Sequence, residues 1–206
     1  MTEVKAPRRR TNTRARLLAA AVDVFVERGG RRVTVDDLVS AAGYTRGAFY
    51  SNFGSVEEVL LEAFKEESER LIAAVRTAVG EHADTDSSGS LIGAAFDAVR
   101  PMQDRWFVLQ SEVVLQSLRD PDAREISSAT FAALSEQLVE VVGLALDRLD
   151  RTSTMPIDLL AQTMMGVFLH SLAMRTLHRD DPRADRLLDD AIPQILDGLS
   201  IPRGSA

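Results

Sequence analysis

The stretch AAGYTRGAFYSNF, residues 41–53, concentrates side chains that can make specific hydrogen bonds. Arg46 is its only long cation, and the residues around it are small or bear hydroxyl and amide groups. Gly47 costs about 1 kcal/mol relative to alanine inside a helix. That cost is explained if another surface must come very close to the backbone there, and a duplex major groove is such a surface. The candidates are Thr45, Arg46, Gly47, Tyr50, Ser51 and Asn52.

Two short helices joined by a glycine turn would present these side chains. Thr34 opens the first, with Asp37 three residues on, close to a capping box. Gly43 ends it, and Thr45 caps the second, so residues 34–52 have the proportions of a helix-turn-helix. Phe49 and Phe53, four residues apart on the opposite face, are predicted core residues with no DNA role, and for Tyr50 and Arg46 packing and solvation are the competing interpretations.

Helical periodicity extends along almost the whole chain. A first helix is predicted from about Thr13 to a stop at Gly29-Gly30, and a long one over about 55–80. No stretch alternates for long with the period of a strand, so we expect an all-α fold. Pro193 should kink the last helix. The remaining helices are predicted near 90–100, 102–119, 122–149, 157–178 and 184–199.

Charge is unevenly distributed along the sequence. The net charge is −7, yet residues 1–53 hold ten basic and five acidic side chains. This contrast suggests an N-terminal part that faces a polyanion, on an acidic body. A solvated basic tail without a partner explains the charge alone equally well.

Composition argues against several classes of protein. The 206 residues are 45% hydrophobic, enough for a packed core, and include no cysteine, which fits a reducing cytoplasm. No apolar run approaches the roughly 20 residues of a membrane span. There is no phosphate-binding loop, HExxH or G-x-S-x-G motif, and the three histidines lack metal-ligand spacing. We therefore expect no enzyme activity, no cofactor, no metal and no membrane association.

Residues 13–64 resemble the DNA-binding domain of the TetR family of transcriptional regulators. The resemblance covers about a quarter of the chain without a gap, and Val56 departs from it where the family usually has lysine. Its landmarks are Glu27-Arg28-Gly29, Thr34, Ala42-Gly43, Gly47, Phe49-Tyr50 and Phe53.

The resemblance implies a homodimer that binds a roughly palindromic DNA operator, most often as a repressor. By family position Arg46, Tyr50 and Asn52 would contact bases or phosphates, assisted by Thr45 and Ser51. Arg14 and the helix start at Thr34 would hold phosphates, and a helix N-terminus is a natural phosphate site.

The expected domains are a basic flexible arm (1–12), a helix-turn-helix DNA-binding domain (13–54), a helical ligand-binding and dimerisation domain (55–200) and a tail (201–206). The Arg8–Arg10 arm would track the DNA backbone or minor groove, or remain disordered.

The resemblance also implies a pocket for a small-molecule effector and an interface built from the last two helices. For any single residue in either set, packing within the subunit is the competing interpretation. The candidate pocket residues are Met102, Trp106, Phe107, Gln110, Glu112, Met164 and Phe168. The candidate interface residues are Met165, Leu169, Leu188, Ala191, Ile195 and Leu199.

An all-helical small-molecule-binding protein without DNA function is the main alternative. It leaves Gly47, Arg46 and the charge split unexplained, and a gel-shift screen would separate the two.

Overall fold

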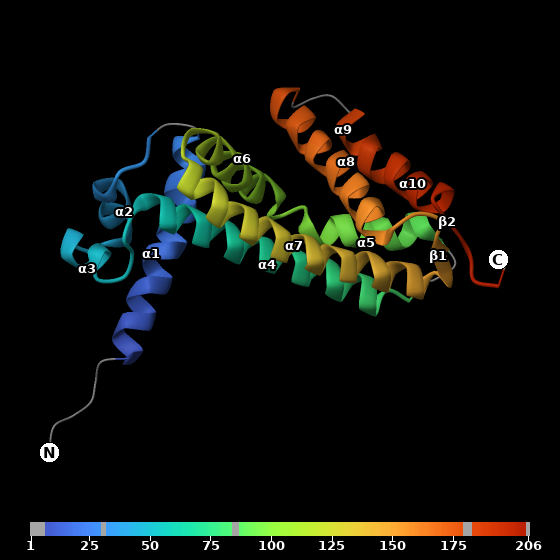
Figure 1. The fold of residues 1–206 in the computed structure, drawn as a ribbon, viewed down its shortest axis with the longest axis horizontal. Helices are drawn as coiled ribbons and strands as arrows, with labels where there is room; N and C mark the ends of the chain where they lie inside the picture. Colours follow the sequence, from blue (N-terminus) through green and yellow to red (C-terminus); the bar gives the residue numbers. More distant parts are fainter. Residues whose placement is uncertain (1–6, 30–31, 84–86, 179–182, 205–206) are drawn as a thin grey trace, which may run out of the picture. The chain divides into compact units, whose positions relative to one another are not determined.

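The computed structural model describes residues 7–29, 32–83, 87–178 and 183–204. They are almost entirely helical, which confirms the all-α prediction (Figure 1). The helices are α1 Pro7–Arg28, α2 Val35–Ala42, α3 Arg46–Tyr50, α4 Val56–Glu81, α5 Ser88–Val99, α6 Gln103–Arg119, α7 Pro121–Arg148, α8 Ile157–Leu177, α9 Arg183–Arg186, the π-helix η1 Leu187–Ala191 and α10 Ile192–Gly198. The strands are β1 Arg151–Ser153 and β2 Ser200–Pro202.

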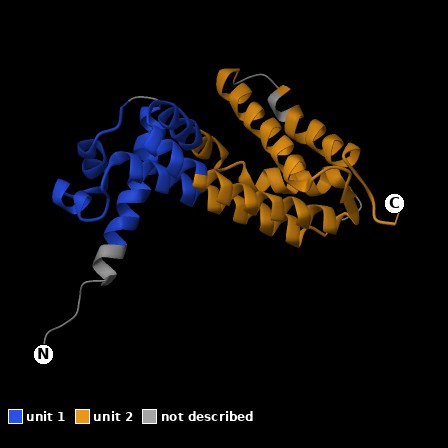
Figure 2. Ribbon diagram, in the orientation of Figure 1, with its two compact units in different colours: residues 1–67, 108–128 blue, residues 68–107, 129–206 orange. Residues whose placement is uncertain are grey.

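The chain divides into two compact units (Figure 2). The first comprises residues 1–67 and 108–128, and the second residues 68–107 and 129–206. In this division the first turns of α4 fall in the first unit, and the functional junction at 54/55 stays a prediction. These early turns of α4 bury Val59, Ala63 and Phe64, which serve as core residues of the first unit.

The predicted helix ends in the first unit have the expected caps. Thr34 and Asp37 form a complete capping box at α2, and Gly43 ends that helix in the left-handed conformation with φ 70°. The Thr45 hydroxyl accepts from the amide of Ala48, and the Ser55 hydroxyl from the amide of Glu58. Each cap satisfies an amide that the helix itself leaves without an acceptor.

The first helix begins earlier than predicted. It starts at Pro7, not near Thr13, so residues 7–12 of the predicted flexible arm are helical, including Arg8–Arg10. Proline suits the first helical position because its missing amide hydrogen needs no partner there, and arginine is a good helix former. The arm residues 1–6 lie outside the described residues, as does Gly30. Gly29, with φ 43°, follows the end of α1 as predicted.

The final predicted helix, 184–199, is interrupted. α9 leads into η1, and Pro193 is the second residue of α10. Proline cannot donate a backbone hydrogen bond and its ring crowds the carbonyl four residues earlier. The wider π-helical turn just before it accommodates both effects, where we had predicted a kink.

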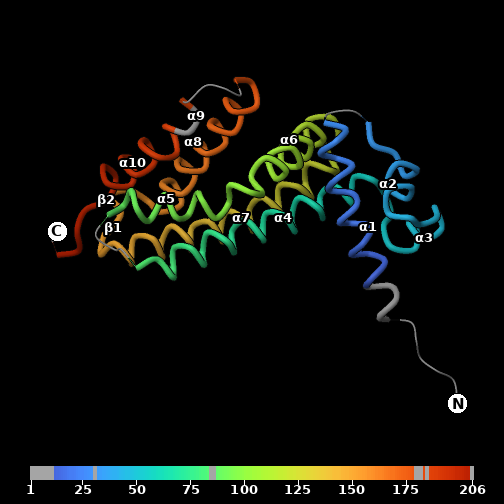
Figure 3. Tube along the Cα trace, turned by 180° about the vertical axis from the view of Figure 1, so that it is seen from behind, coloured from blue at the N-terminus to red at the C-terminus, as the bar shows by residue number. Residues whose placement is uncertain are grey.

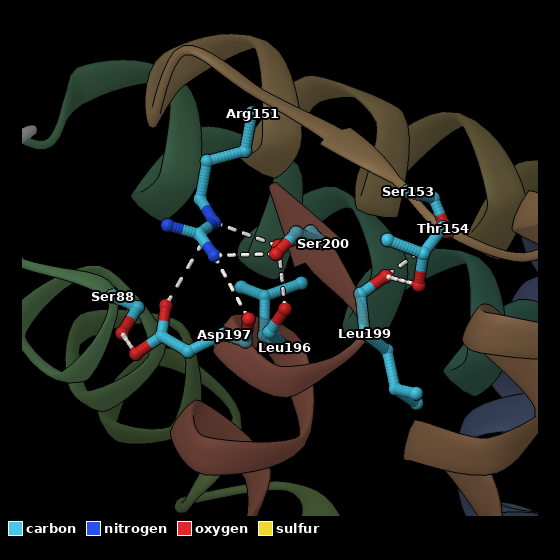
Figure 4. A network of polar contacts seen from close by, with 8 residues as sticks. All are labelled: Ser88, Arg151, Ser153, Thr154, Leu196, Asp197, Leu199 and Ser200. Carbon is cyan, nitrogen blue, oxygen red and sulfur yellow. Dashed lines mark hydrogen bonds and ion pairs between the residues drawn. The ribbon is translucent and has the colours of Figure 1, made fainter. Parts of the chain in front are cut away.

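The sequence did not predict the two-stranded β-ribbon that the structure contains. β1 pairs antiparallel with β2, and three residues are too few to show a strand's alternation. In the view from behind, this ribbon lies beside the ends of α5 and α10 (Figure 3). Arg151 of β1 donates to the Ser200 hydroxyl (2.7 Å) and the Asp197 carbonyl (2.8 Å), and Ser88 of α5 donates to the Asp197 carboxylate (2.7 Å; Figure 4). The network thus joins both strands, α5 and α10.

Two helices, α7 and α8, are long and apolar enough by length and composition to cross a membrane. The lengths of uninterrupted apolar runs in the sequence predict no membrane-spanning helix. Core helices of soluble proteins meet the same criteria, and α8 buries Leu160, Phe168 and Leu172 inside the second unit. We treat both as bundle helices.

Candidate nucleic-acid interface

Helix α3 is short and has one buried and one exposed face. Phe49 is fully buried, and Phe53 just beyond the helix is nearly so, with their ring centroids 5.9 Å apart. Tyr50 is 56% exposed, although its ring meets the edge of Phe49 at 5.3 Å. The two phenylalanines therefore anchor the helix, as predicted, and leave Arg46, Gly47 and Tyr50 on the solvent side.

Nothing among the residues that the structure describes requires a glycine at position 47. Gly47 is exposed, and its φ lies outside the left-handed range that favours glycine. A Cβ atom built there would be 3.8 Å from the Thr45 hydroxyl, an ordinary contact. Because glycine also weakens a helix, its use at this place points to something outside the chain that approaches the backbone.

Arg46 is paired with a carboxylate in the absence of DNA. Its Nη1 lies 3.5 Å from Oδ2 of Asp36 at the start of α2, and the two side chains are 62% and 68% exposed. Such an exposed pair contributes little stability. A polyanion can therefore displace Asp36 at small cost. The sequence does not predict a role for Asp36, because only the fold brings it beside Arg46.

The remaining polar residues around α3 make local hydrogen bonds. The Ser51 hydroxyl donates to the Gly47 carbonyl (2.8 Å), and Asn52 Nδ2 donates to the Ala48 carbonyl (2.7 Å). Asn52 is half-buried, and its Oδ1 is buried with no hydrogen-bond partner among the described residues. Thr45 and Ser51 are exposed. Their roles as DNA contacts remain predictions.

The start of α2 is more acidic than a simple phosphate site. The Thr34 hydroxyl donates to Asp37 Oδ2 (2.7 Å), and the Thr34 amide donates to the same oxygen (2.9 Å). Hydrogen bonds from the Thr34 side chain and backbone, with the nearby Arg28 charge, lower the pKa of Asp37. Two carboxylates, Asp36 and Asp37, therefore already occupy the end of the helix that would attract a phosphate.

Arg14 of α1 is engaged inside the first unit. Its guanidinium donates to the backbone carbonyl of Asn52 and to the Glu62 carboxylate of α4. It also lies 3.8 Å from Glu58 and 4.2 Å from the centre of the Phe53 ring. The sequence predicted a phosphate contact, which no observation tests.

The candidate pocket residues have different surroundings. Trp106 and Phe168 are buried in an aromatic cluster with Phe96, at centroid separations of 5.9 and 5.7 Å, and the Trp106 indole donates to Ser68 (2.7 Å). Gln110 and Glu112 belong to the first unit, and the other five to the second. The half-buried ones are Met102, Phe107, Gln110, Glu112 and Met164.

A groove of about 460 Å³ lies elsewhere in the second unit, along α8, α9, η1 and α10. None of the predicted pocket residues lines it, whereas Ala191 of the predicted interface does. Its lining residues are His170, Met174, Arg183, Arg186, Leu187, Asp190, Ala191 and Gln194.

One predicted interface residue faces inward. Leu188 is only 1% exposed in the single chain, because the π-helical turn directs it into the core of the second unit. The other five are half-buried: Met165, Leu169, Ala191, Ile195 and Leu199. On α8, Leu159 and Leu177 are exposed by 46% and 73% and were not predicted.

Residues 17–63 match the model of the family described as bacterial regulatory proteins, tetR family. The chain is 28% identical over 156 residues to the HTH-type transcriptional regulator SrpR of Pseudomonas putida, covering 76% of this chain and 70% of that protein. It is 26% identical over 166 residues to the HTH-type transcriptional repressor AcnR of Corynebacterium efficiens, covering 79% and 82%.

Solved structures share the whole fold. A putative transcriptional regulator from Rhodococcus sp. RHA1 superimposes with a TM-score of 0.74 at 18% identity, covering 91% of this chain and 95% of that one. A putative TetR-family regulator from Mesorhizobium loti gives 0.71 at 16% identity, covering 94% and 99%.

Fold and site together define a helix-turn-helix DNA-binding protein with a second helical unit. Residues 17–63 carry the DNA-binding domain of the tetR family of bacterial regulatory proteins, as the sequence resemblance predicted, and relatives named as transcriptional regulators match over most of the chain. Its relatives are regulators and not enzymes.

Proposed function

We propose that this protein is a cytoplasmic, ligand-responsive repressor that binds a palindromic operator as a homodimer. The observation that carries the DNA-binding mode is Gly47, an exposed helical glycine that no contact within the described part of the chain requires. Arg46 and Tyr50 flank it on the same exposed surface. In this docking the backbone at Gly47 lies against the major groove, and Arg46 reads a base edge.

A substitution that improves the helix while obstructing the groove tests this docking. Gly47→Ala adds a methyl group without an internal clash, and it should raise the free energy of unfolding by about 0.5 kcal/mol. The same variant should bind the operator at least tenfold more weakly. The operator is first selected by the wild-type protein from a randomised duplex library, and affinities are measured by fluorescence anisotropy.

Gly93→Ala is the matched control, because Gly93 lies in α5 and a Cβ there meets nothing within 4 Å. Like the Gly47 variant it adds one methyl group to a helix without a close contact, but away from the proposed DNA surface, so it should leave operator affinity unchanged. Unaltered binding by Gly47→Ala would show that α3 does not approach DNA at this position.

The homodimer is supported by apolar surface on α8. Only 28% of its most apolar stretch is buried within the chain, and the adjacent groove has Met174, Leu187 and Ala191 among its lining. A second copy that packs α8 and α10 against the same helices would bury this surface. Two copies related by a two-fold axis would read a palindromic operator.

Gly166 of α8 offers a clean test of the dimer. It is exposed, and a side chain there meets nothing within 4 Å in the single chain. Gly166→Arg should therefore fold normally yet shift the protein to monomers in sedimentation experiments. Gly80→Arg on α4, equally open, should leave the mass unchanged. A dimeric Gly166→Arg protein would exclude the middle of α8 from the interface.

The effector response is supported by the aromatic cluster of the second unit. Trp106 is the single tryptophan of the chain, so intrinsic fluorescence reports on its contacts with Phe168 and Ser68. A compound that enters between these groups should change the emission and release the selected duplex at the same concentrations. A helical small-molecule binder without DNA function predicts fluorescence changes but no selected duplex. Repression is proposed from relatives that are named as repressors, AcnR and KstR2 among them.

A further inference from the structure

Arg14 lies where three elements of the first unit meet. It belongs to α1, its guanidinium donates to the backbone carbonyl of Asn52 just beyond α3, and it also donates to Glu62 of α4. These are charge-assisted hydrogen bonds, the stronger class in proteins. The planar guanidinium can serve two acceptors in fixed directions, which a lysine ammonium cannot reproduce.

The turn between α3 and α4 is held on both sides of Phe53. The carbonyl of Asn52 accepts from Arg14, and the amide of Gly54 donates to Glu58 Oε2 at 2.7 Å. Phe53 itself is 2% exposed and lies under the Arg14 guanidinium, whose central carbon is 4.2 Å from the ring centre. Because α3 has only five residues, this turn fixes the angle at which its exposed face is presented.

We infer that Arg14 is a positioning residue for the recognition helix and not a phosphate ligand. It sets the orientation of α3 through the Asn52 carbonyl and through Glu62 and Glu58 of α4. The inference rests on the proposed DNA-binding function and assigns Arg14 a role different from the one its family position implies.

The conservative substitution Arg14→Lys separates the two roles. Lysine keeps the positive charge but cannot donate in two fixed directions, to Asn52 and to Glu62. A phosphate contact would therefore survive the substitution, whereas the positioning of α3 would not. We expect about tenfold weaker binding to the selected duplex. Binding to a scrambled duplex and the slope of log affinity against log salt concentration should stay at wild-type values. Arg16→Lys, two residues along α1, is the control and should change none of these.

Removing the Glu62 carboxylate, which accepts from Arg14, should change DNA affinity in opposite directions under the two roles. Glu62→Ala should weaken binding to the selected duplex relative to the scrambled one, because Arg14 loses a partner that orients it. If Arg14 were a phosphate ligand, freeing it from Glu62 would tighten binding to both duplexes. Glu57→Ala, an exposed carboxylate in the first turn of α4, corrects for the loss of one negative charge.

Hydrogen exchange supplies a measurement that needs no DNA. The amides of Asn52 and Phe53 both donate to the Phe49 carbonyl, at 2.8 and 2.9 Å. In Arg14→Lys these amides should exchange at least fivefold faster than in wild type, and in Arg16→Lys they should not. If the wild-type protein selected no duplex from the library, this would count against the proposed function. The exchange rates of the Asn52 and Phe53 amides would still show whether Arg14 holds the turn between α3 and α4.

The inference is overturned by either of two results. One is an Arg14→Lys protein with wild-type exchange and wild-type affinity for the selected duplex. The other is an Arg14→Gln protein that loses affinity equally on both duplexes, with a salt slope shallower by about 0.9 per subunit, as expected for a lost phosphate contact.

Discussion

At the scale of single residues, the candidate interface is defined by how its side chains are paired before DNA binds. Arg46 has an exposed carboxylate partner, Arg14 has internal partners, and Gly47 has open space where a side chain could stand. The three residues look similar as members of a family motif. From these environments we propose base contact for Arg46, positioning for Arg14 and close approach of DNA at Gly47.

Asp36 should weaken DNA binding through Arg46. Asp36→Ala removes a negative charge near the proposed DNA surface and frees the guanidinium, so we expect severalfold tighter binding to selected and scrambled duplexes. Arg46→Ala should cost about 1–3 kcal/mol on the selected duplex alone. Affinities of both single variants and the double variant, measured by anisotropy, give the coupling between the two side chains.

In the Arg46→Ala background, the gain from Asp36→Ala on the selected duplex should shrink. An identical gain in both backgrounds would mean that Asp36 acts only by repelling phosphates.

At the scale of elements, short helices depend on their caps. α2 has eight residues and α3 five, too few to be stable alone. Their ends are therefore fixed by Thr34 with Asp37, by the left-handed Gly43 and by Thr45. Each cap is local in sequence, which explains why the helix-turn-helix could be located without a structure.

Thr34→Ala should lower the free energy of unfolding by about 1 kcal/mol at neutral pH, as is typical for a lost N-cap. The carboxyl of Asp37 has its pKa lowered from 3.8 by Thr34, so its contribution is present above 3.8 and is lost as the pH falls through the lowered value. The difference between wild type and variant in urea unfolding should therefore narrow below pH 3.8.

Thr163→Ala is the control, since the Thr163 hydroxyl donates only to the Leu159 carbonyl within α8. Its effect should not depend on pH in this range. A Thr34→Ala difference that persists unchanged at low pH would show that the carboxylate contributes nothing to the cap.

At the scale of the whole molecule, each unit is closed by contacts between residues far apart in the chain. In the second unit, Arg151 connects β1 with Ser200 and Asp197 some 46–49 positions later, and Asp197 in turn binds Ser88 of α5. This network fastens the C-terminal segment to the helical bundle (Figure 4).

Arg151→Ala should destabilise the second unit by about 2–3 kcal/mol, because it leaves several half-buried polar groups without a charged partner. Urea unfolding followed by Trp106 fluorescence measures that unit specifically. Arg76→Ala removes an exposed pair with Glu140, whose side chains are 46% and 64% exposed, and should cost no more than about 1 kcal/mol. Equal losses in the two variants would contradict a structural role for the network.

The sequence by itself determined what depends on neighbouring residues. Helical periodicity, the caps at Thr34 and Thr45, the turn at Gly43 and the buried face of α3 all follow from spacings of one to four positions, and all agree with the structure. The same motif predicted the family. The sequence does not predict the early start at Pro7, because a basic composition is typical of a disordered arm, although arginines are compatible with a helix.

Only the tertiary structure decided which distant residues meet. It pairs Asp36 with Arg46 across ten positions and Arg14 with Glu62 across 48, and it turns Leu188 into the core through a π-helical turn ahead of Pro193. It also forms the β1–β2 ribbon, whose strands are too short to leave a pattern. The physical reason is that periodicity specifies which face of a helix is buried, whereas the partner of a charged side chain depends on how the helices pack in space.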